Sequence, residues 1–374
     1  MKHSLSRTLK QSALTLSAIT LLAGALPPSV LAAPISLADC QNFSPTAMAE
    51  QSSYIMNSYQ YLLKTSQEIS DPQLRQKTAD YLANPVPSLW QRFPGDAEKE
   101  SLKQQLVAAG YLSASASYDQ FLPPMRNTAN PPQPFYAAPG SGYMSHHAYP
   151  GGLATHVASN VKIALGIYNT YKDVYGITLN KDVIIASEML HDLHKPWVFQ
   201  WQSDAASLKE YSIAGTGSHH ILSIAEAMYR NFPKEVVVAI ACAHNHPGTA
   251  QDEAQVVSWL KAAALISGKD PIAAGYLAPS GETLPQPRWI EGFVTHLGDH
   301  DFVLTVPMAQ WTIAQLQNIA KAHYGMSEQD LHSAKFYAFR DYVFSQATIE
   351  RLYTIWVQGG EQKLTDTVLS LVKP

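Results

Sequence analysis

The feature that most constrains this chain is an apolar segment, residues 181–192, that ends in His191-Asp192. Its aliphatic side chains lie on nearly every side of the helix that their spacing predicts, and such a helix is buried in a protein. Its polar end must therefore lie inside the fold or at the floor of a pocket. A buried His-Asp pair without partners costs several kcal/mol. The segment predicts a helical fold built around a polar, partnered site.

Other histidines fall at the ends of further predicted helices. The helices are predicted over residues 152–171, 218–232, 234–244 and 253–267, and the histidines are His156, His220, His244 and His246. One buried histidine alone is more often a hydrogen-bonded core residue. Together with His191 and Asp192 these histidines make six groups, each near the end of an apolar helix, and such a set instead predicts a metal centre of one or two divalent ions. Imidazole and carboxylate ligands suit Mn, Fe, Ni or Zn, and the lack of paired cysteines argues against a structural zinc site.

Four motifs occur in a specific order. They are His-His-Ala-Tyr-Pro-Gly-Gly-Leu-Ala-Thr-His at 146–156, Met-Leu-His-Asp-Leu-His-Lys at 189–195, Ser-His-His-Ile at 218–221 and Ala-His-Asn-His-Pro-Gly at 243–248. This order resembles the HD-domain metal-dependent phosphohydrolase superfamily, and it is most like the branch that contains the 3′-5′ exoribonucleases. The similarity covers about residues 145–271, roughly a third of the chain.

The resemblance implies an all-α helical bundle that carries one or two divalent metals. By resemblance, His156, His191 and Asp192 match the ligands of the first metal. The histidines that hold a second metal in two-metal members match His220, His244 and His246. Lys195 matches the lysine that meets the substrate phosphate, so Asp192 and Lys195 are the expected catalytic residues. The metal would activate a water and polarise a phosphoryl oxygen.

The last ligand of the family departs from its pattern. That ligand is an aspartate in an Ala-Asp-x-Leu/Ile-Ser context, one helix after the paired histidines. Here the context begins at Ala263-Ala264, and a second register puts Lys261 at the position. Asp270 follows off the same helical face. The sequence leaves open whether a later group replaces the aspartate, the candidates being Asp299, His300 and Asp301. His194 also stands where the family often has glycine.

The predicted organisation is an all-α fold that follows an N-terminal targeting signal. Residues 1–32 read as a signal peptide, because Lys2, Arg7 and Lys10 precede an uncharged apolar run and Val30-Leu31-Ala32 suits a signal peptidase. We expect an N-terminal helical region (33–112), a Pro-rich connector (113–142), an HD domain (143–284) and a C-terminal helical region (285–374). Within the last region, residues 293–306 predict a small β-hairpin around Gly298-Asp299-His300.

The net charge of the chain limits the classes of partner that it is expected to bind. The formal charge is −4, and removal of the three basic signal residues leaves 23 basic and 30 acidic residues, or −7. A mildly acidic chain without a basic run is a poor candidate for general nucleic-acid binding. We expect a periplasmic or secreted protein without a stable membrane span after signal cleavage. Of the two cysteines, Cys242 lies in an apolar helix and is expected to be a buried free thiol.

Three functions are consistent with these patterns. The first is an exported metal-dependent phosphohydrolase that acts on a small phosphate ester or nucleotide, and Lys195 favours it. The second is an HD-type di-iron oxygenase, because relatives with a His-rich two-metal bundle carry out that chemistry. The third is a non-catalytic metal- or ligand-binding HD module, which the absence of the usual aspartate would explain.

Overall fold

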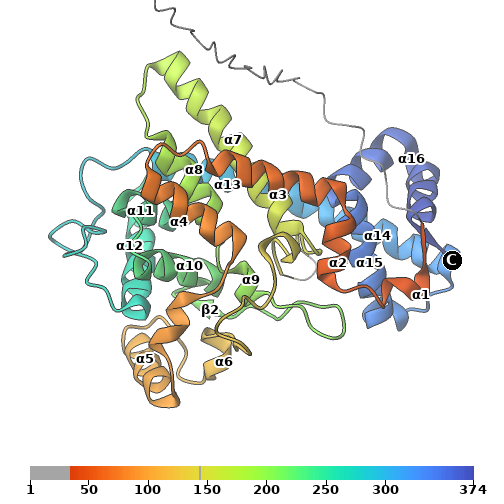
Figure 1. The fold of residues 1–374 in the computed structure, drawn as a ribbon, viewed down its shortest axis with the longest axis horizontal. Helices are drawn as coiled ribbons and strands as arrows, with labels where there is room; N and C mark the ends of the chain where they lie inside the picture. Colours follow the sequence, from red (N-terminus) through yellow and green to blue (C-terminus); the bar gives the residue numbers. More distant parts are fainter. Residues whose placement is uncertain (1–33, 143–144) are drawn as a thin grey trace, which may run out of the picture. The chain divides into compact units, whose positions relative to one another are not determined.

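The computed structural model describes residues 34–142 and 145–374 of the chain (Figure 1), so the predicted signal peptide lies outside the described residues. The described chain consists of helices and short strands that pair as β1 with β4 and β2 with β3. This confirms the predicted all-α class. Within the described residues, no helix has the length and apolar character needed to cross a membrane.

The N-terminal part is a series of helices that begin at side-chain caps. The elements are β1 (Ile35–Ser36), α1 (Leu37–Cys40), α2 (Pro45–Gln51), α3 (Ser53–Ser66), α4 (Pro72–Ala83), η1 (Ser88–Arg92) and α5 (Asp96–Ala108). A continuous helical pattern over residues 44–69 is divided into α2 and α3. Ser52 separates them because its backbone is extended, and its side chain accepts a hydrogen bond from Ile55 N to cap α3.

The central part contains the predicted motif helices. The connector holds α6 (Tyr118–Phe121) and η2 (Phe135–Ala137), and the elements after it are α7 (Gly152–Tyr175), α8 (Lys181–Leu190), α9 (Lys195–Val198), β2 (Ser212–Ile213), β3 (Thr216–Gly217), α10 (Ser218–Tyr229), α11 (Lys234–Cys242) and α12 (Ala250–Ser267). Phe121 and Phe135 are buried, so these two aromatic side chains anchor the connector to the rest of the fold. Further along the central part, strands β2 and β3 form an antiparallel hairpin immediately before α10.

The C-terminal part consists of helices joined by short loops, followed by a final strand. Its elements are α13 (Glu291–Asp299), α14 (Phe302–Tyr324), η3 (Asp330–His332), α15 (Ala334–Ala347), α16 (Ile349–Leu371) and β4 (Val372–Lys373). Strand β4 pairs in parallel with β1, which joins the two ends of the described chain. In Figure 1, α14 and α15 are drawn in blue, and α15 lies beside the red helices α1 and α2.

The hairpin predicted over residues 293–306 is wrong, because this segment forms α13 and the start of α14. The buried positions Gly292, Thr295, His296 and Asp299 follow helical rather than alternating spacing. Gly298, at the predicted turn, and Gly292 instead permit close packing. A side chain at Gly292 would meet the Cys242 sulfur at 2.9 Å, and one at Gly298 would collide with the Glu188 carboxylate on α8.

Two hydrophobic cores account for most of the buried surface. The larger combines side chains of the N-terminal helices and connector with those of α7 to α12. The smaller joins the C-terminal helices to Cys40, Met48 and Tyr149. The predicted N-terminal region thus shares its core with the predicted HD domain, while the domain boundaries themselves stay predictions. Cys40 and Cys242 are both buried and free.

Candidate metal centre

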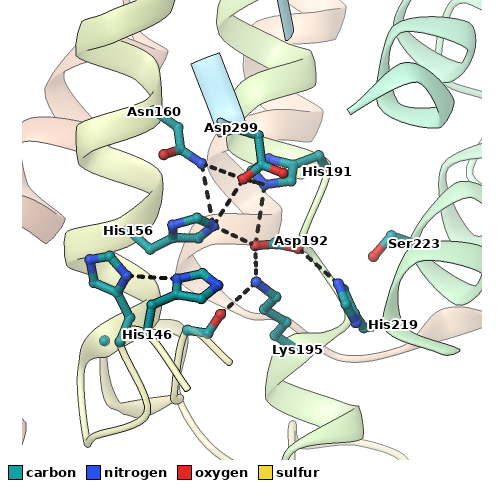
Figure 2. Close-up of polar contacts among 12 residues, drawn as sticks. His146, His156, Asn160, His191, Asp192, Lys195, His219, Ser223 and Asp299 are labelled. Atoms are coloured by element: carbon teal, nitrogen blue, oxygen red, sulfur yellow. Dashed lines mark hydrogen bonds and ion pairs between the residues drawn. The ribbon is translucent and has the colours of Figure 1, made fainter. Parts of the chain in front are cut away.

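Four helices bring the predicted metal ligands together. His156 lies in the first turns of α7, His191 and Asp192 follow the last turn of α8, and His244 follows α11. Asp299, the last residue of α13, completes the group (Figure 2). Helix α13 packs against α7, α8 and α11, which places its C-terminal end among the ends of the other three. Apart from His244, which is partly exposed, these side chains are buried.

The two aspartates face the same histidines. Asp192 Oδ2 lies 3.1 Å from His156 Nε2 and 3.2 Å from His191 Nε2. Asp299 Oδ1 lies 3.2 Å and 3.3 Å from the same two nitrogens. His244 Nε2 approaches the other oxygen of Asp299 at 3.5 Å. Five side chains therefore direct nitrogen and oxygen atoms toward one small volume, and Figure 2 labels four of them, His156, His191, Asp192 and Asp299.

The ring of His191 is oriented by a contact outside this volume. Its Nδ1 lies 2.8 Å from the backbone oxygen of Glu188, one turn earlier. An Nδ1–H that donates to a carbonyl leaves the Nε2 lone pair free for a ligand, as in metal sites where outer partners set the histidine tautomer. Asn160 supports the other side, because its Nδ2 donates to Asp299 Oδ1 at 2.9 Å. These contacts hold the rings and carboxylates in place.

The pKa values of the histidine and carboxylate groups at the centre are shifted by one another. Burial lowers the pKa of His191, but Asp192 and Asp299 outweigh it and raise that pKa well above its usual value. Burial likewise raises the pKa of Asp192, but His191 and Lys195 outweigh it and hold the carboxyl pKa well below its usual value. Asp299 is also lowered well below its usual pKa, mainly because His191 overcomes the effect of burial.

The residues present fit a divalent cation. Asp192 Oδ1 and Oδ2 and His191 Nε2 are buried, yet none makes a contact with hydrogen-bond geometry. These ligand atoms lie close together without hydrogen bonds between them, which is the arrangement expected around a bound ion. One ligand atom each from His156, His191 and Asp299 lies within 4.8 Å of the others, and the same holds for His191, Asp192 and His244. Imidazoles with carboxylates form a donor set typical of Mn, Fe, Ni or Zn.

Lys195 reaches the centre from the first turn of α9. It is 4% exposed, and its Nζ forms an ion pair with Asp192 Oδ2 and donates a hydrogen bond to the Gly140 backbone oxygen. Its ammonium thus occupies one side of the carboxylate that the two histidines face. This is the position expected for the lysine that follows the His-Asp pair.

His219, which the sequence analysis did not single out, lies at the other oxygen of Asp192. Its Nε2 is 3.4 Å from Asp192 Oδ1, while its Nδ1 contacts the Glu210 carboxylate. Glu210 Oε1 also accepts from the backbone N of His219 at 2.8 Å, so it fixes both ends of this residue. The hairpin β2–β3 makes this possible by reversing the chain between Glu210 and α10.

The three histidines expected at a second metal have different surroundings. His220 is buried with both nitrogens lacking hydrogen-bond partners, and its ring centroid lies 4.2 Å from that of His244. His244 is shared with the centre described above. His246 points elsewhere: its ring lies 5.0 Å from that of His296, and its Nδ1 accepts from Gly248 N at 3.1 Å. The structure therefore brings His219, His220 and His244 together near Asp192, but not His246.

Asp299 lies beside the histidines, whereas the two positions predicted to correspond to the family aspartate do not. Ala264 is in the core, and Lys261 pairs with Glu282 at 3.1 Å, so neither reaches the histidines. Asp270 caps a turn through Ile272 N and Ala273 N. Asp299 was one of several candidates, but only the packing of α13 places it. The signal for His219 was its position beside His220 in the same motif.

The N-terminal helices hold the loop that carries the His-Asp pair. The Tyr81 hydroxyl of α4 donates to the Leu193 backbone oxygen. Glu226 of α10 lies 3.4 Å from His194 Nε2 and accepts from Ser88 N and Leu89 N at 2.9 and 2.8 Å. One buried carboxylate thereby joins η1, α10 and the loop. The two aromatic residues after Lys195, Trp197 and Phe199, are 0% and 2% exposed.

Comparison of the sequence with those of known proteins finds a relative that is a phosphodiesterase. The chain is 29% identical over 183 residues to a dihydroneopterin 2′,3′-cyclic phosphate phosphodiesterase of Methanocaldococcus jannaschii, over 49% of this chain. The match spans 58% of the length of that relative. No protein-family model and no solved structure matches the chain. The similarity is thus to a phosphodiesterase, which supports at a general level the expected kinship with phosphohydrolases.

Proposed function

We propose that this chain is a metal-dependent phosphohydrolase that cleaves a small phosphodiester. The observation that carries the proposal is the convergence of Asp192 and Asp299 on the Nε2 atoms of His156 and His191. The similarity to a cyclic-phosphate phosphodiesterase supports the choice of a phosphate ester over other substrates. Within that class, a diester is favoured because the relative acts on one.

The residues around the centre have separate roles in this proposal. A bound divalent cation supplies an activated water and a Lewis acid for the phosphoryl oxygen. Lys195 donates hydrogen bonds to a phosphate oxygen, because its Nζ is held at the centre by Gly140 and points at the Asp192 side. Asp192 accepts a hydrogen bond from the attacking water and orients it. The buried aromatic residues of the loop exclude bulk water from one side.

A cavity of about 610 Å³ lies beside His219, and we infer that it holds the remainder of the substrate. Phe199 and Glu210 line it, and both also contact His219. Ser141 and Lys209 add a hydroxyl and a positive charge to its wall. A small organic group attached to the phosphate can lie here while the phosphate reaches Lys195. The mixed polar and apolar wall is what a nucleoside-sized or pterin-sized group requires.

The position of Asp299 bears on the non-catalytic alternative. That alternative was motivated by the missing aspartate at Ala264 or Lys261, and a carboxylate now stands beside the histidines from another helix. No contact in the described residues favours an oxygenase over a hydrolase. Export of the chain stays a prediction from residues 1–32.

The test is a panel of esters assayed with one metal at a time. Chain stripped with a chelator would be given Mn²⁺, Fe²⁺, Ni²⁺ or Zn²⁺ and then bis(p-nitrophenyl) phosphate, a 2′,3′-cyclic nucleotide and p-nitrophenyl phosphate. We expect metal-dependent cleavage of the diesters in preference to the monoester. Lys195→Met should lower kcat at least 100-fold without loss of bound metal. Equal, metal-independent rates for the unchanged chain and His191→Ala would refute the proposal.

A further inference from the structure

Two adjacent histidines beside the candidate centre have no role in the proposed reaction. His146 and His147 precede α7, and their Nδ1 atoms lie 3.0 Å apart. Their ring centroids lie 5.2 Å and 5.1 Å from that of His156. One ligand atom from each of His146, His147 and His156 lies within 4.8 Å of the others. Because His156 directs its Nε2 at Asp192 and Asp299, the other two rings form a separate pair.

A carboxylate from the C-terminal helices lies beside this pair, although its nearer oxygen has no hydrogen-bond partner in the described residues. Glu350, in the first turn of α16, places Oε1 3.2 Å from His147 Nε2. A carboxylate beside one ring nitrogen favours the proton on that atom and leaves the lone pair on the other. His147 Nδ1 therefore presents its lone pair toward His146. Glu210 acts on His219 in the same way on the far side of Asp192.

The separation of the two nitrogens suits a metal. Two imidazoles at right angles around an ion, each about 2.1 Å from it, have nitrogens about 3.0 Å apart. In the chain without an ion the two Nδ1 atoms have this spacing as a hydrogen bond between the rings, and an ion bound to both would replace the shared proton. A third group is close, since Asp301 Oδ1 is buried without a hydrogen-bond partner and lies 3.8 Å from His156 Nδ1. Unpartnered buried carboxylate oxygen is costly unless a cation or donor meets it.

His147 is also held in an unusual backbone conformation. Its φ angle is +53°, a region that few side chains other than those of Asn, Asp and His adopt. The side chain is 3% exposed, and its backbone oxygen accepts from Gly140 N at 2.8 Å. The surrounding structure thus fixes a strained residue so that its ring faces His146. Such strain is found most often at functional sites.

We propose that His146 and His147 bind a further divalent transition-metal ion, oriented by Glu350 and adjacent to the centre formed by His156, His191, Asp192 and Asp299. Substrate or water oxygen atoms fill its remaining positions. The C-terminal helical region would then take part in metal binding through both Asp299 and Glu350. This inference concerns ion binding alone and does not depend on which reaction the chain catalyses.

The test counts ions without using activity. The full chain is stripped with a chelator, titrated with Mn²⁺ or Zn²⁺ in a calorimeter, and analysed for metal after gel filtration. We expect His147→Asn, which tolerates the positive φ angle, to bind one ion fewer per chain than the unchanged protein. Glu350→Gln should keep that ion but bind it about tenfold more weakly, as for other outer partners of ligand histidines.

Matched variants separate this site from the main centre. His323→Asn and Glu361→Gln alter exposed residues of α14 and α16 and should change nothing. His191→Ala should lose ions at the main centre while keeping the one at His147. Circular dichroism melts establish that each variant is folded. Unchanged ion number and affinity in folded His147→Asn would overturn the inference. It would also be overturned if that variant kept every ion but lost affinity for inorganic phosphate.

Discussion

Replacing Asp299 with asparagine is the sharpest test of the candidate metal centre. The carboxylate faces His156, His191 and His244 at 3.2, 3.3 and 3.5 Å, and it is one of two carboxylates in the centre. Asparagine has the same shape, so the change removes a negative charge and a strong ligand but little volume. Asn160 can still donate to the amide oxygen, as it now does to Asp299 at 2.9 Å.

The size of the effect follows from this geometry. Loss of a group that only orients a ligand costs about 10- to 100-fold in metal affinity. Loss of a ligand should cost at least the upper limit, which is about 2.7 kcal/mol. The metal-free chain should lose about 3 kcal/mol of unfolding free energy, because the buried histidines lose the charge of their carboxylate partner.

The assay is calorimetric titration of the stripped chain with Mn²⁺ or Zn²⁺, together with urea unfolding of the metal-free form. Asp270→Asn is the matched control, since Asp270 is the other aspartate near the family motif and only caps a surface turn. It should bind metal as the unchanged chain does. If Asp299→Asn binds metal with unchanged affinity, or if Asp270→Asn alone weakens binding, the inference that Asp299 completes the centre is refuted.

Three further outcomes are expected from the same contacts. Glu210→Gln should weaken binding of an ion next to His219 by about 10-fold, and His219→Asn should weaken it more; equal titration curves for both variants and the unchanged chain would contradict this. Burial raises the pKa of Glu226, but His194 and Arg230 outweigh it and lower that pKa to about 2 from 4.5. A depressed carboxyl pKa contributes stability above about pH 4.5 that is lost as the pH falls toward 2. Glu226→Gln should therefore be less stable by about 3 kcal/mol at pH 7, and urea unfolding should show this deficit shrinking at pH 4 and below; a deficit independent of pH would count against the ion-pair account. Because the pKa of His191 is raised, a cation must displace a proton, so metal affinity should rise between pH 5 and pH 8. Calorimetry in two buffers of different ionisation enthalpy should detect protons released, and a pH-independent affinity would exclude displacement.

Local patterns determined much of the architecture and half of the centre. The apolar run before His191-Asp192 predicted a buried helix with a polar end, and both residues are 0% exposed. Helical spacing and caps predicted the motif helices to within a few residues, because periodicity and capping act over one or two turns. The same motifs identified His156 and Lys195, which lie at the centre.

Tertiary packing decided the rest. Residues 293–306 carry β-branched and aromatic side chains with a central Gly-Asp, which favour a hairpin locally. They form helices because Gly292 and Gly298 allow α13 to pack closely on α11 and α8, an advantage that exists only when those helices are present. That packing brings Asp299 to His156 and His191, which are more than one hundred residues away along the chain. Which carboxylate completes a metal centre depends on where helix ends meet in space, and spacing along the chain does not encode it.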